Sequence, residues 1–598
     1  MLAQTVGITE ILVVLIYLLM VVYLGWLGYT RTKTASDYLI AGRKIHPFVM
    51  AMSYGATFIS TSAIVGFGGV AGLFGMSLLW LTFLNIFVGI FIAFVFLAPP
   101  ARRMGHRLDA HTFPELLARR FDSKFIQVFA GLVIFLFIPL YAAAVLIGGC
   151  EFISTQFGID YNIALLVFSV IIAAYVVMGG LKGVMYSDAL QGSIMFVGMM
   201  TLLLFTYGKL GGLEKAHSTL SGLAPLVPGK LQAMGHRGWT AMPSFGFGDA
   251  KYDLWWIVVS TITLGVGIGV LAQPQLVVRF MTVKSKRELN RAVLVGGVFI
   301  LIMTGVAFTV GSLSNAFFAQ YGPPFKGRVA NTIDEAKGQV VLQLMKQDET
   351  GKWVDVEGKM APVVLCDAEV DQSAKDAGVV AGRSISIVYA KGNSDQIIPI
   401  YITSAMPKWF GLVFLLTLLA AAMSTLSSQF HAVGTSIGRD VYEQVTGRHG
   451  RSIGVNRAGI ILGIIIAMLW SYYAAQTGYI IARATAIFFG LCASAFLPAF
   501  VGGLFWKRMT KAGAIWSMVG GFVVTAFWLL FVKANEAGDI GLVQKFTGGK
   551  PSILADYPNW PVVDPLVVAL PISIIIAVVV SLATRPSSKE HLAKCFAE

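Results

Sequence analysis

Two apolar stretches of this chain are interrupted in matching places. Residues 48–71 read FVMAMSYGATFISTSAIVGFGGVA, and residues 254–277 read LWWIVVSTITLGVGIGVLAQPQLV. A membrane helix that loses backbone hydrogen bonds must satisfy those groups in another way. Interrupted segments at corresponding positions of two halves predict a transporter with a binding site near the midplane of the membrane. The interruptions are Ser60-Thr61-Ser62 with Gly66, Gly68 and Gly69 in the first stretch, and Gly265, Gly267 and Gly269 with Gln273-Pro274-Gln275 in the second.

The composition is that of a membrane protein. Of the 598 residues, 56% are hydrophobic and only 13% are charged, and the mean hydropathy is +0.74. A soluble domain carries about twice that fraction of charge. We predict an all-α bundle of about 13 transmembrane helices, because each candidate segment is long enough to cross a hydrocarbon core of about 30 Å. The segments are 8–29, 48–71, 76–98, 126–149, 162–179, 189–208, 254–277, 293–316, 409–431, 458–475, 479–504, 513–532 and 564–584.

The net charge of +14 is unevenly placed along the chain. With the N-terminus outside, the inward loops hold most of the Lys and Arg residues, and the short outward turns at 72–75, 150–161 and 476–478 hold none. This asymmetry predicts a multi-pass protein of the cell (inner or plasma) membrane, with its N-terminus outside and its C-terminus in the cytoplasm. The basic charge therefore reports topology, and it does not point to a nucleic-acid partner.

Residues 319–400 differ from the rest of the chain. They are polar and charged, with β-prone stretches at 339–342 and 384–389 that turn signals separate. We predict a small β-rich extracytoplasmic insert between the eighth and ninth spans. It is either a structural cap or a surface that captures a partner or the substrate.

The insert divides the chain into three sections. Residues 1–318 are expected to hold an N-terminal helix, a first set of five spans at about 48–208 and the start of a second set at about 254. Residues 401–598 are expected to hold the remainder of the second set, to about 504, and two C-terminal helices. Internal symmetry is thus predicted in the structure, although no short tandem repeat is visible in the sequence.

Four hydroxyl residues share one face of the ninth span. Ser424, Thr425, Ser427 and Ser428 recur at helical offsets, so they form one stripe. Hydroxyls, together with carbonyls freed by a broken helix, supply the oxygen ligands that sodium needs with little fixed charge. The alternative is that these residues join helices or hydrogen-bond to their own backbone.

Three further residues are candidates for a site, each with a plain alternative. Asp188 is either an ionisable group at membrane depth, which indicates a functional role, or an interfacial carboxylate that pairs with Lys182 or caps a helix. Arg483 is the one Lys or Arg inside a predicted span; it binds a substrate carboxylate or extends to the outer interface. Trp255, beside Trp256, stacks on a substrate or belongs to an interfacial aromatic belt.

Other classes of membrane protein fit the sequence less well. A haem or quinone subunit is expected to carry axial histidines at membrane depth, and only His431 falls within a predicted span, at its edge. We also find no Walker loop and no G-x-S-x-G elbow. We therefore expect a transporter driven by an ion gradient and not an enzyme.

Six motifs resemble those of the sodium:solute symporter family, whose members include proline, pantothenate, monocarboxylate, sialic acid and sugar cotransporters. Their order and their spans also match, and the resemblance covers nearly all of the chain apart from the insert. The motifs are Ser36 to Arg43; Thr112 to Leu117 with Arg120-Phe121; Gly179-Gly180-Leu181 with Asp188; Gln273-Pro274-Gln275 with Arg279-Phe280; Ala421 to Thr425; and Gly438 to Tyr442.

The resemblance implies a LeuT-like inverted repeat of 5+5 helices with an extra N-terminal helix. It also implies one or two sodium ions. The main sodium site would use the carbonyls of Ala56, Ile59 and Ala421 with the hydroxyls of Ser424 and Thr425. A second site would use Asp188, Ser427 and Ser428. Sodium would bridge the first broken helix to the hydroxyl stripe and, if it binds that shape more tightly, favour the outward-facing one.

Departures from the family pattern bear on the substrate. Proline carriers have an aspartate where this chain has Phe58, the sugar-binding residues are not evident, and Arg483 favours an anion. We therefore expect symport of a small organic carboxylate (monocarboxylate or pantothenate-like), with an amino acid such as proline as the alternative substrate and a solute sensor as the alternative class. The oligomeric state stays open. The expected substrate-binding residues are Thr57, Phe58, Ser60, Trp255, Gln273, Gln275 and Arg483.

Overall fold

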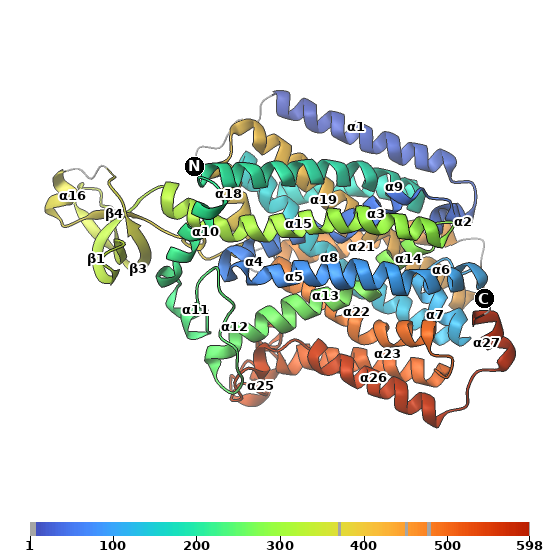
Figure 1. Ribbon diagram of the computed structural model, residues 1–598. Helices are drawn as coiled ribbons and strands as arrows, with labels where there is room; N and C mark the ends of the chain where they lie inside the picture. Colours follow the sequence, from blue (N-terminus) through green and yellow to red (C-terminus); the bar gives the residue numbers. More distant parts are fainter. Residues whose placement is uncertain (1–7, 369–371, 449–451, 475–479, 597–598) are drawn as a thin grey trace.

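The computed structural model describes residues 8–368, 372–448, 452–474 and 480–596. Its long helices lie side by side in one bundle, and a small β-barrel projects from one end (Figure 1). Within the described ranges, eleven helices are long and apolar enough to cross a membrane, and one bent pair makes a twelfth span. The shorter apolar helix Tyr161–Ala174 coincides with the remaining predicted segment. The predicted all-α membrane bundle is confirmed.

The first half of the bundle begins with a helix at its periphery, α1 (Figure 1), which packs against α9. Several large apolar side chains of α1 are exposed. This helix is the extra N-terminal helix that was expected. The helices of this half are α1 (Ile8–Arg31), α2 (Ala35–Ile40), α3 (Pro47–Phe58), α4 (Phe67–Phe74), α5 (Leu79–Ile86), α6 (Ala98–Arg107), α7 (Phe113–Phe121), α8 (Lys124–Phe157), α9 (Tyr161–Lys209), α10 (Leu213–Gly222) and α11 (Gly229–Ala233).

The second half also contains an interrupted helix, and it ends in two further spans and a short terminal helix. Its helices are α12 (Asp253–Trp256), α13 (Gly267–Gly269), α14 (Pro274–Phe280), α15 (Lys286–Tyr321), α16 (Gln372–Asp376), α17 (Ser386–Tyr389), α18 (Ile397–Ala405), α19 (Lys408–Thr435), α20 (Glu443–Thr446), α21 (Ser452–Ala474), α22 (Ile480–Phe505), α23 (Lys511–Phe527), α24 (Ala534–Ile540), α25 (Leu542–Thr547), α26 (Leu566–Ala583) and α27 (Lys589–Phe596).

Both predicted helix interruptions are present. After α3 the backbone is extended at Ile59 (ψ 104°), and the chain resumes as a π-helical turn, Ser62–Gly66, that continues into α4. The segment Ser62–Phe74 is bent by 52° from α3. Before α14 the backbone is extended at Gln273 (ψ 121°). Proline then begins α14, at the helical position where its missing N–H is not needed.

The glycines do not make these interruptions, contrary to the prediction. They lie within helical turns and allow other segments to approach closely. A Cβ on Gly69 would lie 2.0 Å from the carbonyl oxygen of Ser394, and one on Gly269 would lie 2.3 Å from that of Phe489. The glycines therefore serve packing between helices, a common use of small residues in membranes.

A second difference concerns α9, which covers two predicted spans. The chain passes directly from one to the other through a kink at Gly180 (φ 56°, ψ −177°), where we expected a loop up to residue 188. A Cβ at Gly180 would lie 2.7 Å from the ring of Tyr38. Asp188 is consequently inside the helix and fully buried, so it neither caps a helix start nor pairs with Lys182, whose ammonium group binds Asp37 (3.2 Å).

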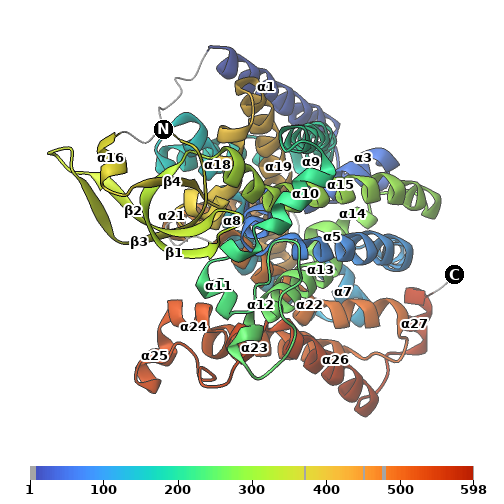
Figure 2. The same ribbon diagram turned by 60° about the vertical axis from the view of Figure 1, so that its left-hand side comes forward.

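The insert is a closed antiparallel barrel with the strand order β1-β2-β3-β4 (Figure 2). A small apolar core of its own fills it, made by Val340, Leu342, Ala361 and Val363. The predicted β-rich insert is thus confirmed, and the side of the membrane that it faces stays a prediction. The strands are β1 (Phe325–Asp334), β2 (Gln339–Gln347), β3 (Trp353–Leu365) and β4 (Val380–Arg383).

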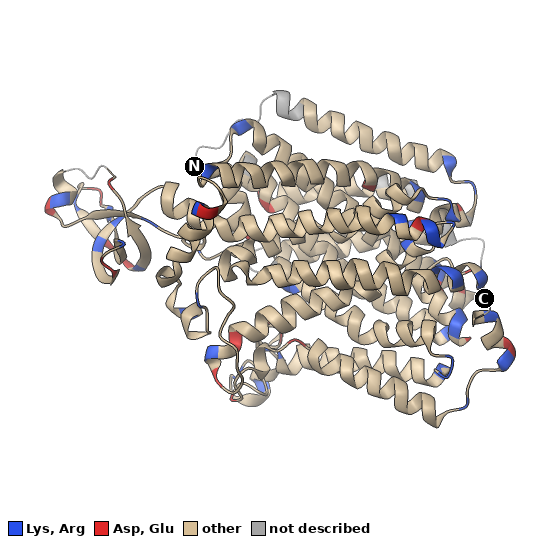
Figure 3. Ribbon diagram, viewed as in Figure 1, with Lys and Arg blue, Asp and Glu red and all other residues tan. Residues whose placement is uncertain are grey.

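Charged side chains are distributed unequally between the two ends of the bundle. Figure 3 shows Lys and Arg gathered at the end away from the barrel, around α6, α7 and α27, while the long helices between the ends carry few charges. We call this end the basic end. Such an asymmetry is the structural counterpart of the loop charges in the sequence.

Candidate functional site

The break after α3 frees carbonyl groups that the hydroxyl stripe of α19 then meets. Because the chain leaves the helical path at Ile59, the carbonyls of Ala56 and Thr57 lack the N–H donors that would follow them in a helix. The Ser424 hydroxyl donates to the Ala56 carbonyl (2.8 Å). The Thr425 hydroxyl donates to the Thr57 carbonyl (3.2 Å) and lies 3.4 Å from that of Ala56.

This cluster contains four of the five ligands expected for the main sodium site. The carbonyl oxygen of Ala421 lies 3.1 Å from Ser424 Oγ, and the residues are fully buried. Ile59 is the residue at which the helix breaks, and its place among the ligands stays a prediction. The oxygens are neutral, and they are clustered at the C-terminal end of α3, where the helix dipole is negative. Such a set suits an alkali cation that must bind and leave again.

A second cluster, on the next turn of α19, is ionic. Asp188 accepts a hydrogen bond from Ser53 (2.6 Å), and Arg279 Nη2 lies 3.0 Å from the same carboxylate oxygen. Arg279 Nη2 also lies 2.6 Å from Ser428 Oγ, and Nε donates to Ser53 Oγ (2.9 Å). Arg279 is 1% exposed and Asp188 is fully buried. We call these residues, with Thr57, the Asp188–Arg279 cluster.

The second predicted sodium set is therefore brought together only in part. Asp188 and Ser428 meet through Arg279, whereas the Ser427 hydroxyl donates to the Ser424 carbonyl of its own helix (3.0 Å). Arg279 was not among the predicted site residues, because sequence reasoning placed it in an inner loop just beyond the seventh span. The available signal was the Gln273-Pro274 break, which starts a new helix and returns the chain to the bundle.

A small cavity lies at the first break and is the candidate solute site. Both broken helices, α5, α8, α15 and α22 enclose about 20 Å³, room for a water molecule but not for a solute. Polar groups come from Ser60, Asn85, Tyr141, Thr304 and Thr485. Among the described residues, Asn85 Oδ1 has no hydrogen-bond partner, although Asn85 is only 2% exposed. The remaining lining residues are Phe58, Ile59, Ala63, Phe67, Leu81, Val266, Phe308 and Phe489.

Only two of the seven predicted substrate residues, Phe58 and Ser60, line this cavity. Thr57 belongs to the Asp188–Arg279 cluster. Gln275 donates to Gln273 (2.7 Å) and borders a separate cavity of about 30 Å³ beside Arg279.

The remaining two predicted substrate residues have partners elsewhere. The ring centroid of Trp255 lies 4.7 Å from that of Phe245, in an edge-to-face arrangement. Arg483 binds Glu536 (3.3 Å) and Asp539 (2.9 Å) of α24. The guanidinium thus already has two carboxylate partners, and the argument from Arg483 for an anionic substrate fails.

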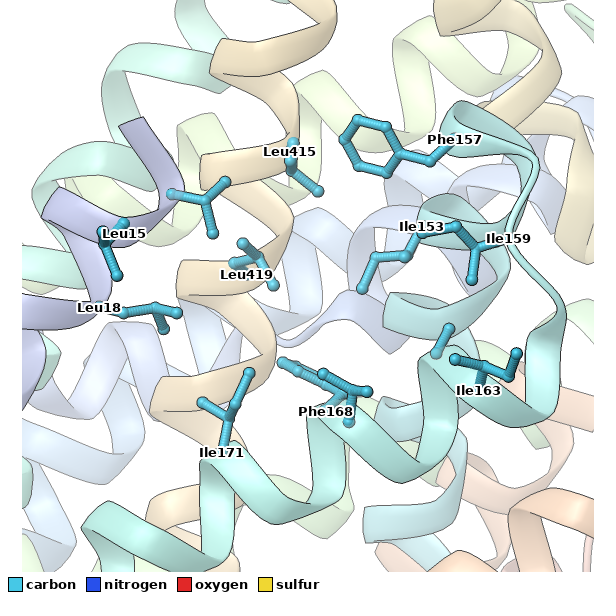
Figure 4. A pocket seen from close by; sticks show the side chains of 13 residues that line it. Leu15, Leu18, Ile153, Phe157, Ile159, Ile163, Phe168, Ile171, Leu415 and Leu419 are labelled. Carbon is cyan, nitrogen blue, oxygen red and sulfur yellow. The ribbon is translucent and has the colours of Figure 1, made fainter. Parts of the chain in front are cut away.

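A larger cavity is apolar and lies elsewhere. It measures about 430 Å³ and is bordered by α1, α8, α9 and α19 (Figure 4). Leu15, Leu419 and Phe168 point into it, and its lining is hydrocarbon and aromatic throughout. A space of this kind offers no ligand to an ion or a charged solute.

Known proteins match this chain along most of its length. The Osmoregulated proline transporter OpuE of Bacillus subtilis (strain 168) is 24% identical over 89% of this chain and 91% of its own. The High-affinity proline transporter PutP of the same strain is 25% identical over 84% and 89%. The Sodium/proline symporter of Staphylococcus aureus (strain bovine RF122 / ET3-1) is 24% identical over 91% of both chains.

A solved structure confirms the fold. A Na+-coupled sialic acid symporter in a substrate-bound outward-open state superposes with a TM-score of 0.67, at 18% identity, over 98% of this chain and 99% of that one. The expected LeuT-like architecture is therefore correct.

The match to a family model settles the family. The model described as the sodium:solute symporter family covers residues 38–352 and 374–521, and so extends into the insert, which we had expected to lie outside the resemblance. With this match over most of its length, the chain belongs to the sodium:solute symporter family.

Proposed function

We propose that this protein carries a small zwitterionic amino acid, of the proline type, together with sodium. The observation that carries the sodium half is the meeting of the Ser424 and Thr425 hydroxyls with the freed carbonyls of Ala56 and Thr57. These oxygens come from two helices that must move relative to each other in alternating access. An ion held between them links its binding to the position of α3.

The geometry of the solute cavity supports a zwitterion better than the carboxylate that we expected. None of the described residues that line the cavity is charged, and Arg483 is bound elsewhere. A broken helix presents the negative end of one half-helix beside the positive end of the other. The two ends would bind an ammonium or imino group and a carboxylate of one small molecule, and Asn85 Oδ1 would accept a further N–H. The curated relatives are named as proline transporters, which favours the same class.

Sodium and solute would be coupled through the break after α3. Ala56 and Thr57 face the ion site, and Phe58 and Ser60, directly after them, face the solute cavity. When sodium orders the backbone at this break, it therefore also orders the lining of the solute cavity, and the solute acts on the sodium site in the same way. Because such coupling is reciprocal, solute must tighten sodium binding by the factor by which sodium tightens solute binding.

The distribution of charge supports an orientation in the membrane. The basic end would face the cytoplasm, so that the barrel and the start of α1 would lie outside and α27 inside (Figure 3). Sodium, concentrated outside, would then enter from the barrel side. This assignment is tested in intact cells by labelling single cysteines that are introduced either in the barrel or in α27.

Uptake into proteoliposomes tests the proposal. Labelled proline, lactate, pyruvate and pantothenate would each be offered with and without an inward sodium gradient. We expect sodium-dependent accumulation of proline or of another small zwitterion that competes with it. Accumulation of a monocarboxylate instead would overturn the zwitterion assignment. Binding without accumulation would make the protein a solute sensor.

A further inference from the structure

The apolar cavity beside α1 is a groove that opens towards the surrounding lipid (Figure 4). The 13 residues that border it are all aliphatic or phenylalanine, and we call this space the α1 groove. Phe168 and Leu419 form its floor, because they are only 2% and 8% exposed. Leu15, Ile163 and Val167 stand at its mouth and are 49% to 57% exposed. Hydrocarbon of the bilayer can therefore reach the floor.

The way in which α1 is held leaves this gap in the bundle. The buried Tyr17 hydroxyl donates to the sulfur of Met423 (3.5 Å) and accepts a hydrogen bond from Gln191 (3.2 Å). Further along α1 the backbones come close together, since a Cβ on Gly183 would lie 3.4 Å from the carbonyl oxygen of Gly25. The middle and the later turns of α1 are thus fixed to the bundle, and the groove lies beside its earlier turns.

The size of the α1 groove fits a single hydrocarbon chain. An empty apolar space forfeits dispersion contacts, and even an apolar cavity of about 150 Å³ takes up benzene. The α1 groove measures about 430 Å³. Its border on α9 runs from Ile163 to Ile171, about 12 Å at the helical rise per residue. One leaflet supplies about half of a hydrocarbon core of about 30 Å, so one acyl chain can lie along the groove within one leaflet.

A free cation marks the end of the groove. Because α8 begins beside α7 at the basic end, its turn into α9 at Ile159 brings the groove to the barrel end. Lys408, the first residue of α19, is exposed and shares a helix face with Leu415 and Leu419, about 10 Å beyond the groove. No carboxylate of the described residues pairs with Lys408. Asp160 at the α8–α9 turn is also exposed, and it accepts the N–H of residue 162 as a helix cap (2.8 Å).

We propose that the α1 groove binds one acyl chain of an anionic phospholipid, whose headgroup phosphate meets Lys408. The lipid comes from the leaflet at the barrel end of the bundle. Basic side chains at a membrane surface attract anionic headgroups, and the groove supplies the apolar surface that fixes one chain of the same molecule. The site is separate from the sodium and solute sites, so the inference holds whichever solute the protein carries.

Photolabelling in proteoliposomes tests the site. The probe is phosphatidylglycerol with a photoactivatable group midway along one acyl chain, and mass spectrometry locates the labelled residues. We expect labelling of Phe168 and Leu419 to exceed several-fold that of Phe83 and Ile575, although those two side chains are 55% and 59% exposed elsewhere on the bundle. Labelling that simply follows exposure would overturn the inference.

Two neighbouring substitutions separate the groove from the general lipid-facing surface. Val167 borders the groove and Leu166 does not, and their side chains are 53% and 56% exposed on the same helix. In Val167→Trp the added ring fills the mouth, so we expect the labelling of Phe168 and Leu419 to fall to the level of the general surface. Leu166→Trp is the matched control and should leave it unchanged. Undiminished labelling in Val167→Trp would contradict a bound chain.

The headgroup is tested by comparing phosphatidylglycerol with a phosphatidylcholine probe that carries the same reactive chain. We expect the unmodified protein to be labelled several-fold more by the anionic probe. In Lys408→Gln this preference should disappear, while labelling of the groove by the phosphatidylcholine probe stays as it was. Equal labelling of the unmodified protein by both probes, or a preference that survives in Lys408→Gln, would overturn the assignment of the headgroup to Lys408.

Discussion

Two neighbouring parts of the hydroxyl stripe on α19 have different partners. Ser424 and Thr425 meet neutral carbonyls at the break after α3, whereas Ser428, one turn later, meets the paired charges of Asp188 and Arg279. Neutral carbonyl and hydroxyl groups can attract a cation and release it again, because no unpaired charge is left behind. A buried carboxylate cannot easily release its cation, because an unpaired charge at that depth is expensive. The stripe thus joins a neutral oxygen cluster, which we propose as the sodium site, to a buried ion pair.

Breaking the ion pair is expected to have the largest effect. In Asp188→Asn the guanidinium of Arg279 keeps its charge and loses its counterion inside the bundle. Loss of one partner of a buried pair costs about 3–5 kcal/mol. We expect uptake to fall below detection and the thermal unfolding temperature of the purified protein to drop markedly.

The double variant Asp188→Asn/Arg279→Gln is the control for this prediction, because it leaves neither charge unpaired. We expect it to recover most of the lost thermal stability. An Asp188→Asn protein as stable as the unmodified one would show that the pair is not an energetic unit.

The neutral part of the stripe is tested through sodium affinity. Ser424→Ala and Thr425→Val each remove one hydroxyl ligand, and we expect the sodium concentration for half-maximal uptake to rise about tenfold or more, equivalent to about 1.4 kcal/mol. Thr417→Val is the matched control, since the Thr417 hydroxyl on the same helix donates to its own backbone (2.9 Å). Equal sodium dependence in all three variants would remove the main sodium site from α19.

The positions of the spans, the two interrupted helices and the hydroxyl stripe could be predicted because each is written in a local pattern. Apolar length, helical spacing and polar interruptions act over a few turns. The glycines show the limit of such patterns. They pointed to the correct helices, but Gly69 and Gly269 accommodate carbonyls of other helices, and the breaks lie at Ile59 and Gln273.

The ionic contacts could not be predicted, because their partners are distant in sequence. Arg279 and Asp188 are 91 residues apart, and Arg483 meets a carboxylate 53 residues later. A hydropathy pattern ends a span before a basic residue, so it assigned Arg279 to a loop. It left Arg483 isolated, because α24 lay in a segment with no expected role.

The cavity at the first break, our proposed solute site, resembles the proposed sodium site in that its polar groups are neutral. Asn85→Leu removes an oxygen that has no partner among the residues that the structure describes, and we expect a loss of about 0.5–1.5 kcal/mol in solute binding. The Michaelis constant for solute should rise about three- to tenfold, with the sodium dependence at saturating solute unchanged. Thr304→Val is the control, since the Thr304 hydroxyl donates to Ile300 of its own helix (2.8 Å). Equal effects of both changes would contradict a direct contact between Asn85 and the solute.

Arg483 offers a second ion pair with a different expectation. Its partner Asp539 is largely exposed, so solvent weakens the interaction. The other partner, Glu536, is buried and loses this cation in Arg483→Gln. We therefore expect Arg483→Gln to lower thermal stability but to change the Michaelis constant for solute by less than about twofold. A rise of more than tenfold in the Michaelis constant would restore Arg483 as a substrate ligand.

The smallest effect is expected from pH, at a charged cluster near the basic end. Burial alone would raise the pKa of Glu115, but His111, Arg439 and Arg119 outweigh it and lower the pKa to about 2. A carboxyl group with a depressed pKa stabilises the fold above its unfolded pKa of about 4.3, and the stabilisation is lost as the pH falls from there towards 2. The difference in unfolding temperature between the unmodified protein and Glu115→Gln should therefore stay constant from pH 5 to 8 and shrink only below about pH 4. Asp109→Asn, at an exposed carboxylate, is the control. A difference that already changes between pH 6 and 8 would mean that this cluster titrates in the physiological range. Its charges would then not be fixed, unlike those of the Asp188–Arg279 cluster.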